Sequence, residues 1–200
     1  MSQIRSNAIA EIHPALGNRW SPRAFAPDRP VARETLLACL EAGRWAPSCF
    51  GDEPWRFIVA DRDTNGDTWE AMLGCLAEKN QLWARHAPVL LLACAVGEFR
   101  RGGENRWAQY DTGSASLSIC IQAEALGLAS HQMGGFDADA ARAAFHIPDD
   151  VTPMAAIALG YQAPADSLDE GFRGIELGER KRQPLGACFF DGDWEAPIPE

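Results

Sequence analysis

The nine residues from Pro88 to Val96 carry no charge, and every one of them is apolar or small. A strand with one face in water alternates apolar and polar residues, whereas this run has no polar face. We therefore expect a strand at the centre of a sheet that is covered on both sides. The shorter run from Met154 to Leu159 has the same character and predicts a second buried strand.

Segments with a helical spacing of apolar residues surround these two runs. Helices are predicted at residues 4–16, 31–45, 67–79 and 137–145, and further strands at 57–60 and 130–133. Asp137 is placed to cap the last of these helices. About four strands are then expected, without the glycine fingerprint of a dinucleotide-binding fold.

Residues 111–128 form the predicted helix with the least polar surface. Nearly every position is small or apolar, including Gly113, Ser116 and Ser118. A helix that is apolar all round is buried, and small residues let a second helix approach it closely. The pattern predicts a helix at the centre of a dimer, with the core helix of a monomer as the alternative. The polar segment 97–110 is either a mobile loop over a pocket or an ordinary connector.

Composition and charge exclude several classes of protein. The chain has 200 residues, of which 46% are hydrophobic and 23% charged, and this fits one globular domain. No apolar run approaches the roughly 18 residues that cross a bilayer, and no signal peptide is recognisable, so we expect a cytoplasmic protein with no membrane partner. A net charge of −10 argues against a nucleic-acid partner. Residues 1–50 nevertheless carry six arginines against four acids, which suits a small phosphorylated ligand.

The six cysteines form no Cys-x-x-Cys pair, and four of them lie within apolar runs. They are expected to be free thiols in a reducing compartment. Cys49 lies instead in a turn beside Ser48. No adjacent histidine or lysine would lower its pKa, which favours a packing role over a reactive thiol. The four histidines are too dispersed for a local zinc motif, so no metal site is predicted.

Two separated stretches carry the residues with the most specific chemistry. Residues 18–25 place Arg19, Ser21 and Arg23 within five positions, so two guanidiniums and a hydroxyl can donate to one phosphate. Residues 46–57 combine prolines with small residues ahead of an apolar run. A backbone turn of this kind can approach a flat ring closely.

These stretches resemble the opening motifs of the FMN-dependent nitroreductase family, and further motifs in the family's order extend the resemblance from Arg19 to about Pro184. The resemblance implies an α+β, three-layer α/β/α fold, with a central mixed and mainly antiparallel sheet flanked by helices, in an intertwined homodimer. It implies one nitroreductase-like domain over residues 1–200. Within it, residues 185–200 would form a C-terminal arm that packs on the partner subunit.

The resemblance also implies cofactor-binding residues and no catalytic side chain. The contacts to the ribityl phosphate end of FMN would be Arg19, Trp20, Ser21, Arg23, Arg180 and Arg182. The contacts to the isoalloxazine ring would be Pro47, Ser48 and Cys49 from the other subunit, together with Asn80, Trp83, Gln132, Met133, Gly134 and Gly135.

Two of these ring contacts have a clear chemical reason. The amide of Asn80 offers the donor and acceptor that the pyrimidine edge of a flavin requires, although a helix C-cap is the alternative. Gly134 would donate its backbone N–H to flavin N5, and glycines let the main chain approach a planar ligand without Cβ collisions. The sequence departs from the family pattern at Trp20, Gly51 and Glu53, where a polar or basic residue, Asn and Gln are usual.

The activity implied is transfer of hydride from NADH or NADPH, through flavin N5, to a nitroaromatic, a quinone or a similar small-molecule oxidant. Two alternatives remain open. The first keeps the fold but uses the flavin for reductive dehalogenation or for breaking down flavin itself, with residues 97–110 contacting the substrate. The second is a flavin-binding protein that is not an enzyme.

Overall fold

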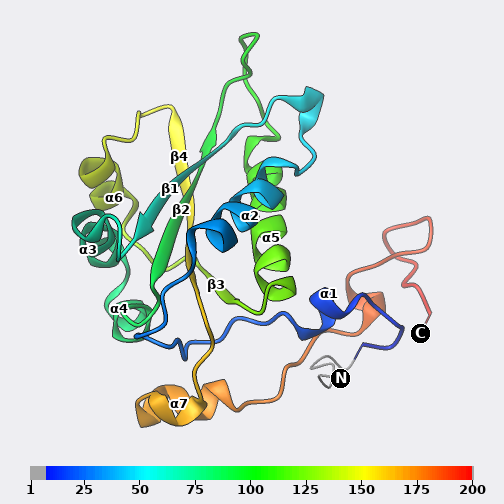
Figure 1. Ribbon diagram of the computed structural model, residues 1–200. Helices are drawn as coiled ribbons and strands as arrows, with labels where there is room; N and C mark the ends of the chain where they lie inside the picture. Colours follow the sequence, from blue (N-terminus) through cyan, green and yellow to red (C-terminus); the bar gives the residue numbers. More distant parts are fainter. Residues whose placement is uncertain (1–7, 200) are drawn as a thin grey trace.

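The computed structural model describes residues 8–199, and within them four strands form one sheet (Figure 1). The strands lie in the order β1-β2-β4-β3, and all three pairings are antiparallel. Their bounds are Trp55–Asp61 for β1, Val89–Val96 for β2, Ala129–Met133 for β3 and Val151–Gly160 for β4. The two runs predicted to be buried are the two central strands, β2 and β4, which confirms that prediction.

Helices cover both faces of the sheet. On one face lie α2 (Arg33–Arg44) and α5 (Ala108–Ala125), and on the other α3 (Gly66–Cys75), α4 (Glu78–Ala84) and α6 (Ala138–Phe145) (Figure 1). Leu91 of β2 belongs to the apolar cluster under α2 and α5, and Leu92 to the cluster under α3, α4 and α6. Because successive side chains of a strand point to opposite faces, β2 must be apolar throughout. The predicted three-layer fold is confirmed.

α5 is the helix expected at residues 111–128, and it begins three residues earlier. It lies close to α2, because a Cβ on Gly43 of α2 would stand only 2.8 Å from Cγ1 of Ile119. Its other side is open, since Tyr110 is 76% and Leu117 44% exposed. The prediction that this helix is buried all round is therefore wrong for the single chain. Its place in a dimer stays a prediction.

The helix predicted at residues 67–79 is two helices, α3 and α4. Leu76 leaves the helical path and pairs with Phe136 in an isolated β-bridge, so a contact distant in sequence interrupts the helical spacing. Asn80 is consequently the third residue of α4. The alternative that Asn80 caps a helix C-terminus is wrong.

The helix predicted at residues 4–16 also differs. Residues 4–7 lie outside the described part of the chain, and residues 8–13 are not helical. Instead α1 spans Pro14–Asn18, and the Nδ1 atom of His13 accepts a hydrogen bond from the N–H of Ala15 at 3.2 Å. Proline is well suited to the first helical position, which explains the later start.

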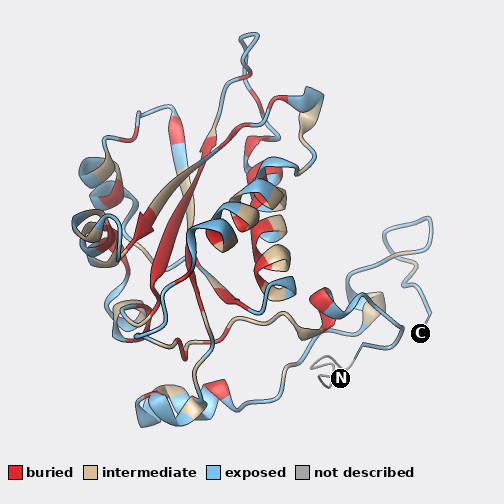
Figure 2. Cartoon of the chain, viewed as in Figure 1, coloured by how far each residue is buried: buried red, intermediate tan, exposed pale blue. Residues whose placement is uncertain are grey.

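Two arms extend away from the three layers (Figure 1). The first holds α1, and the second follows β4 and includes α7 (Glu170–Glu176), a helix that the sequence analysis did not predict. Figure 2 shows that both arms are mostly exposed, whereas the sheet is buried. Several large apolar side chains of the arms are exposed, namely Ile9, Leu16, Ile175, Leu177, Phe189 and Trp194. Among the described residues, no helix is long and apolar enough to span a bilayer.

Candidate cofactor site

The segment that carries Arg19, Ser21 and Arg23 crosses from α1 to the sheet. Backbone hydrogen bonds fix its end to the chain after β4, because Ala26 N–H donates to the carbonyl of Tyr161 at 2.9 Å and Ala163 N–H donates to that of Ala24 at 3.0 Å. Ala24 is fully buried, whereas the two arginines and Ser21 keep partial exposure. The buried end of the segment therefore anchors a partly exposed, basic stretch.

His131 of β3 holds this segment from the side. Its Nδ1 lies 2.9 Å from the carbonyl oxygen of Pro22, and its ring centroid lies 4.5 Å from that of Trp83. Burial, and to a smaller extent the positive charges of Arg23 and Arg19, lower the pKa of His131 from 6.5 to about 4. The ring is therefore neutral at pH 7. Because a carbonyl only accepts, Nδ1 carries the hydrogen and donates it to Pro22.

Arg19 also lies near the opposite side of β3. Its positive charge acts to lower the pKa of the Cys120 thiol, which burial raises, and Cys120 Sγ accepts a hydrogen bond from Nε2 of Gln132 at 3.4 Å. The stretch of residues 18–25, called the arginine motif from here on, thus reaches the edge strand β3 close to Gln132. Two motifs that are more than 100 residues apart in sequence, and that were predicted to bind one ligand, are brought together here.

The end of β3 meets α4 through Asn80. Its Nδ2 donates to the carbonyl of Gly135 at 2.9 Å, and the N–H of Ala77 donates to the same carbonyl at 2.9 Å. A Cβ on Gly135 would stand 2.8 Å from this Nδ2, so any other residue here would displace the Asn80 amide from its hydrogen bond. A Cβ on Gly134 would meet nothing within 4 Å. The backbone at Gly134 therefore presents an open face that a flat ring can approach.

Two residues predicted to contact the cofactor lie in the core. Trp83 is 1% exposed and stacks on Phe25 with a centroid distance of 6.2 Å, beside His131. Met133 is 3% exposed. The Trp83 ring packs against the His131 ring, and the side chain of Met133 is buried, so Met133 could contact a ligand only through its backbone.

The segment of Pro47, Ser48 and Cys49 lies at the other end of α5. Cys49 N–H donates to Oδ2 of Asp111, in the first turn of that helix, at 2.9 Å. Cys120, beside which Gln132 lies, is nine residues further along α5, about 13 Å at 1.5 Å per residue. One chain therefore does not bring this segment together with the arginine motif, and its assignment to the partner's site stays a prediction.

The two C-terminal arginines differ in placement. Nη1 of Arg180 donates to the carbonyl of Gly17 at 3.1 Å, which puts Arg180 directly beside the arginine motif. Arg182 is exposed, and its Nη1 donates to the neighbouring carbonyl of Lys181 at 2.8 Å. Arg180 is thus part of the gathered site, and a phosphate contact by Arg182 stays a prediction.

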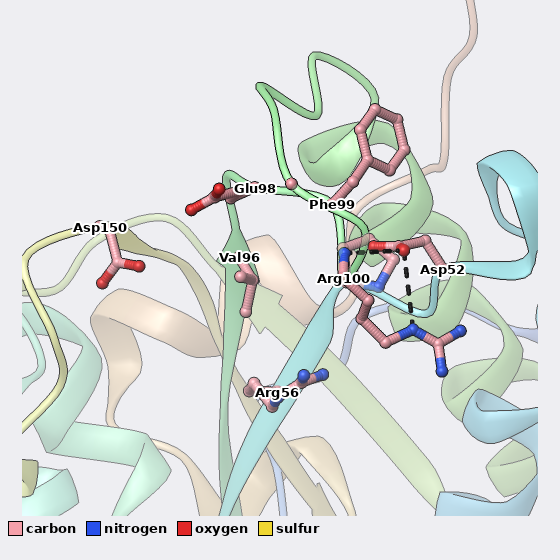
Figure 3. A pocket seen from close by; sticks show the side chains of 9 residues that line it. Asp52, Arg56, Val96, Glu98, Phe99, Arg100 and Asp150 are labelled. Carbon is pink, nitrogen blue, oxygen red and sulfur yellow. Dashed lines mark hydrogen bonds and ion pairs between the residues drawn. The ribbon is translucent and has the colours of Figure 1, made fainter.

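A cavity of about 370 Å³ lies elsewhere, where Asp52, Arg56, Glu98, Phe99 and Asp150 surround it at one end of the sheet (Figure 3). Oδ1 of Asp52 accepts the N–H of Arg100 at 3.1 Å and pairs with its guanidinium at 3.6 Å. This buried carboxylate ties the loop between β2 and α5 to the segment after Cys49. The contact anchors Arg100 within the segment 97–110, whose last three residues belong to α5, and a role of this segment as a mobile loop over a pocket stays a prediction.

The buried cysteines are protonated, and the His, Cys, Asp and Glu side chains of the described residues form no cluster that could bind a metal. Burial raises the pKa of Cys39 and of Cys94 to about 11, so these thiols are protonated at neutral pH. Cys75 and Cys120 are also buried and free, as predicted for the four cysteines in apolar runs. Within residues 8–199, no three His, Cys, Asp or Glu side chains gather as a metal site would require.

Sequence reasoning missed two residues that hold the site together. In the sequence, His131 stands out only as part of the strand predicted at residues 130–133, and Glu176 of α7 does not stand out at all. Glu176 accepts the backbone N–H of Arg23 with both carboxylate oxygens, across 153 positions of sequence. His131 could have been noticed as an ionisable side chain within a short predicted strand, whereas Glu176 has no local signal.

Known proteins are similar to this chain in sequence and in fold. The family model described as "Nitroreductase family" matches residues 16–161. A protein of Mycolicibacterium smegmatis, named "Uncharacterized 15.4 kDa protein in ask 5'region", is 35% identical over 150 residues, which are 72% of this chain and 99% of that protein. A "Putative NADH dehydrogenase/NAD(P)H nitroreductase" of Methanothermobacter thermautotrophicus is 30% identical over 159 residues, which are 76% of this chain and 78% of that relative.

A crystal structure described as an oxidoreductase containing FMN superposes with a TM-score of 0.90 at 32% identity. The match covers 98% of this chain and 99% of the other, so it includes the arms as well as the three layers. The family model alone covers well over half of the 200 residues. The chain belongs to the nitroreductase family.

Proposed function

We propose that this chain is an FMN-dependent oxidoreductase that takes hydride equivalents from NADH or NADPH and passes them to a nitroaromatic, a quinone or a similar organic acceptor. The observation that carries the proposal is the gathering of Arg19 and Arg23 at the edge strand whose end carries the open backbone of Gly134. FMN has a phosphate at one end and a flat ring at the other, and this site has a matching group for each.

The phosphate end fits the basic side chains. Arg19, Arg23 and Arg180 lie around one short segment, and Ser21 adds a hydroxyl that can donate. Guanidinium groups bind phosphate oxygens with charge-assisted hydrogen bonds, which are roughly twice as strong as neutral ones. An acidic protein with this local excess of arginines attracts a small phosphate ester while repelling a polyanion.

The ring end fits the glycine pair and Asn80. A substituted Cβ would find open space at Gly134, so the peptide there can come within van der Waals distance of a flat ring. Asn80 spends one N–H on Gly135 and keeps its other N–H and its carbonyl oxygen for a ligand. These groups suit the edge of a flavin, which offers both donors and acceptors.

When bound, FMN supplies the two-electron chemistry, with hydride entering and leaving at its N5 position. The side chains of this chain bind the cofactor, orient it and exclude water. His131 donates its Nδ1 hydrogen to Pro22 and is neutral, so it is no proton donor to a ligand. The buried thiols of Cys39 and Cys94 keep their protons, so neither supplies a thiolate at neutral pH.

We propose further that the working unit is a homodimer made of one domain per chain. The exposed side of α5, with Tyr110 and Leu117, and the exposed apolar residues of the arms need cover. A second copy would cover them and would bring Pro47, Ser48 and Cys49 to the ring end of the neighbouring site. In this arrangement residues 185–200 pack on the partner subunit as an arm.

Absorbance spectroscopy tests the proposal. We expect the purified protein to show the absorbance bands of flavin, to lose them on anaerobic addition of NADH or NADPH, and to regain them when a nitroaromatic or a quinone is added. A protein that binds FMN but is not bleached by either nucleotide would contradict an NAD(P)H oxidoreductase. A protein that binds no FMN would contradict the proposed cofactor.

A further inference from the structure

Glu176 is a carboxylate at a position that is unfavourable for a negative charge. It is the last residue of α7, where a negative charge opposes the helix dipole, and it is only 6% exposed. A buried charge is costly unless it is paired or hydrogen-bonded. The reason for its burial must therefore lie in its contacts outside α7.

Within the described residues, Glu176 accepts hydrogen bonds from the backbone of the arginine motif. Oε2 of Glu176 accepts the backbone N–H of Arg23 at 2.9 Å, while Oε1 accepts the same N–H at 3.2 Å and that of Ala24 at 3.2 Å. Both N–H groups are thus satisfied inside the protein and are not offered to a phosphate. The direction of the Arg23 side chain is set by a backbone that Glu176 fixes.

A second contact fixes the other end of the same segment. Arg180, four residues after Glu176, donates to the carbonyl of Gly17 at 3.1 Å. The C-terminal arm therefore bonds the backbone just before Arg19, through Arg180, and again at Arg23, through Glu176. Between these points, His131 bonds the carbonyl of Pro22.

We propose that Glu176 is a positioning residue for the phosphate of the flavin: it holds the backbone of Arg23 so that the guanidinium meets the phosphate, and so it sets the preference for FMN over riboflavin. This inference rests on the proposed function, because it takes FMN as the ligand. The carboxylate itself repels a phosphate dianion, so two effects of opposite sign compete. Positioning predicts weaker FMN binding when Glu176 is removed, whereas dominant repulsion predicts tighter binding.

Riboflavin separates these effects from a general loss of structure, because it has the same ring and no phosphate. The full-length protein, stripped of flavin, is titrated with FMN and with riboflavin while flavin fluorescence is followed. For Glu176→Ala we expect the Kd for FMN to rise roughly tenfold, and the Kd for riboflavin to change by less than about twofold. Glu176→Gln keeps one acceptor oxygen, so its Kd for FMN should rise only about threefold.

Glu170→Gln is the matched control, because Glu170 lies on the same helix, is exposed and has the same charge. It should bind both flavins as the wild type does. Equal losses for FMN and riboflavin in the Glu176 variants, or tighter binding of FMN, would overturn the inference. If Glu176→Ala does not fold, Glu176→Gln decides, and an unchanged ratio of the two Kd values overturns it. A wild type that binds FMN no more tightly than riboflavin would overturn the phosphate site itself.

Discussion

The three layers and the two arms of this chain are held together by different kinds of interaction. In the layers, the side chains of β2 are buried on both faces by apolar neighbours, and no single contact is decisive. In the arms, large apolar side chains such as Trp194 are exposed, and order comes from a few specific hydrogen bonds. The layers form a scaffold, and the arms carry most of the groups proposed to bind the phosphate.

The difference matters for function because the arginine motif lies where the two regions meet. His131 belongs to the sheet, Glu176 and Arg180 belong to the C-terminal arm, and all three hold residues 17–24. A site built in this way can lose ligand affinity without unfolding of the layers.

The largest effect is expected in the layers. Leu91→Ala removes a fully buried side chain from β2 and should lower the free energy of unfolding by about 2–5 kcal/mol, through lost transfer energy and a residual cavity. Trp194→Ala in the arm, where the side chain is 80% exposed, should change it by less than about 0.5 kcal/mol at a protein concentration that keeps the chain monomeric. Urea denaturation measures both. Similar losses in the two variants would contradict the division into scaffold and arms.

The next effect concerns the phosphate end. Arg23→Ala removes a charged donor, and a lost hydrogen bond to phosphate should cost about 1.5–3 kcal/mol, or roughly 10- to 150-fold in the Kd for FMN. The melting temperature of the flavin-free protein should stay nearly the same, because Arg23 is partly exposed. Arg182→Ala is expected to act in the same direction. Unchanged FMN affinity in both variants would remove the phosphate assignment.

Much of the scaffold could be predicted from the sequence, and the physical reason is burial. The apolar runs of β2 and β4 have one consistent interpretation, and Asp137 caps α6 through the N–H groups of Asp139 and Ala140 as expected. The break between α3 and α4 could not be predicted, because Leu76 leaves the helix for a strand-like contact with a residue 60 positions away. Local spacing contains no information about that partner.

For the candidate site, the sequence supplies a set of proposed members, and the structure supplies their arrangement. The family resemblance selected the arginines, Asn80 and the glycine pair, and the structure gathers Arg19, Arg23 and Arg180 around one segment. The resemblance could not indicate Glu176, since an acid at the end of a short exposed helix resembles any solvated charge. The resemblance also selected Trp83, whose ring lies in the core beside His131.

A third prediction concerns the ring end of the site. Gly134→Val finds open space in the protein, so it should leave the fold intact, yet its branched side chain should hold a flat ring away from the backbone. Because hydride transfer depends on close and aligned reactants, displacing the ring should slow flavin reduction by NADH or NADPH about ten- to hundredfold. Stopped-flow absorbance measures the rate. Gly135→Ala is the contrast, because its Cβ collides with Asn80 and should destabilise the protein itself.

The pH dependence of stability should report on the contact between sheet and arm. The pKa of His131 is about 4 in the folded chain, below its ordinary value of 6.5, so the unfolded state binds more protons between these values. The contribution of His131 is complete above pH 6.5 and is lost as the pH falls toward 4. Because the ring keeps partial exposure, we expect a loss of about 1–2 kcal/mol.

Urea denaturation at several pH values between 4 and 7 measures this loss, and His131→Gln should show a flatter profile than the wild type. His146→Asn is the control, because His146 is exposed and its left-handed backbone suits asparagine. A profile of His131→Gln that parallels the wild type would assign the acid sensitivity to other groups.

The smallest effect is expected at Cys49. Its backbone N–H bonds Asp111, and this bond does not depend on the side chain. Serine keeps the size of the side chain, so Cys49→Ser should retain FMN and change the turnover with NADH or NADPH by less than about twofold. Cys39 and Cys94 in the layers are the contrast, since replacing either buried thiol by serine places a hydroxyl in the apolar core and should lower stability by about 1–3 kcal/mol. If Cys49→Ser bound FMN normally but could no longer be reduced, a thiol would have to take part in the reaction, and the proposal that no side chain of this chain acts as an acid or nucleophile would fail.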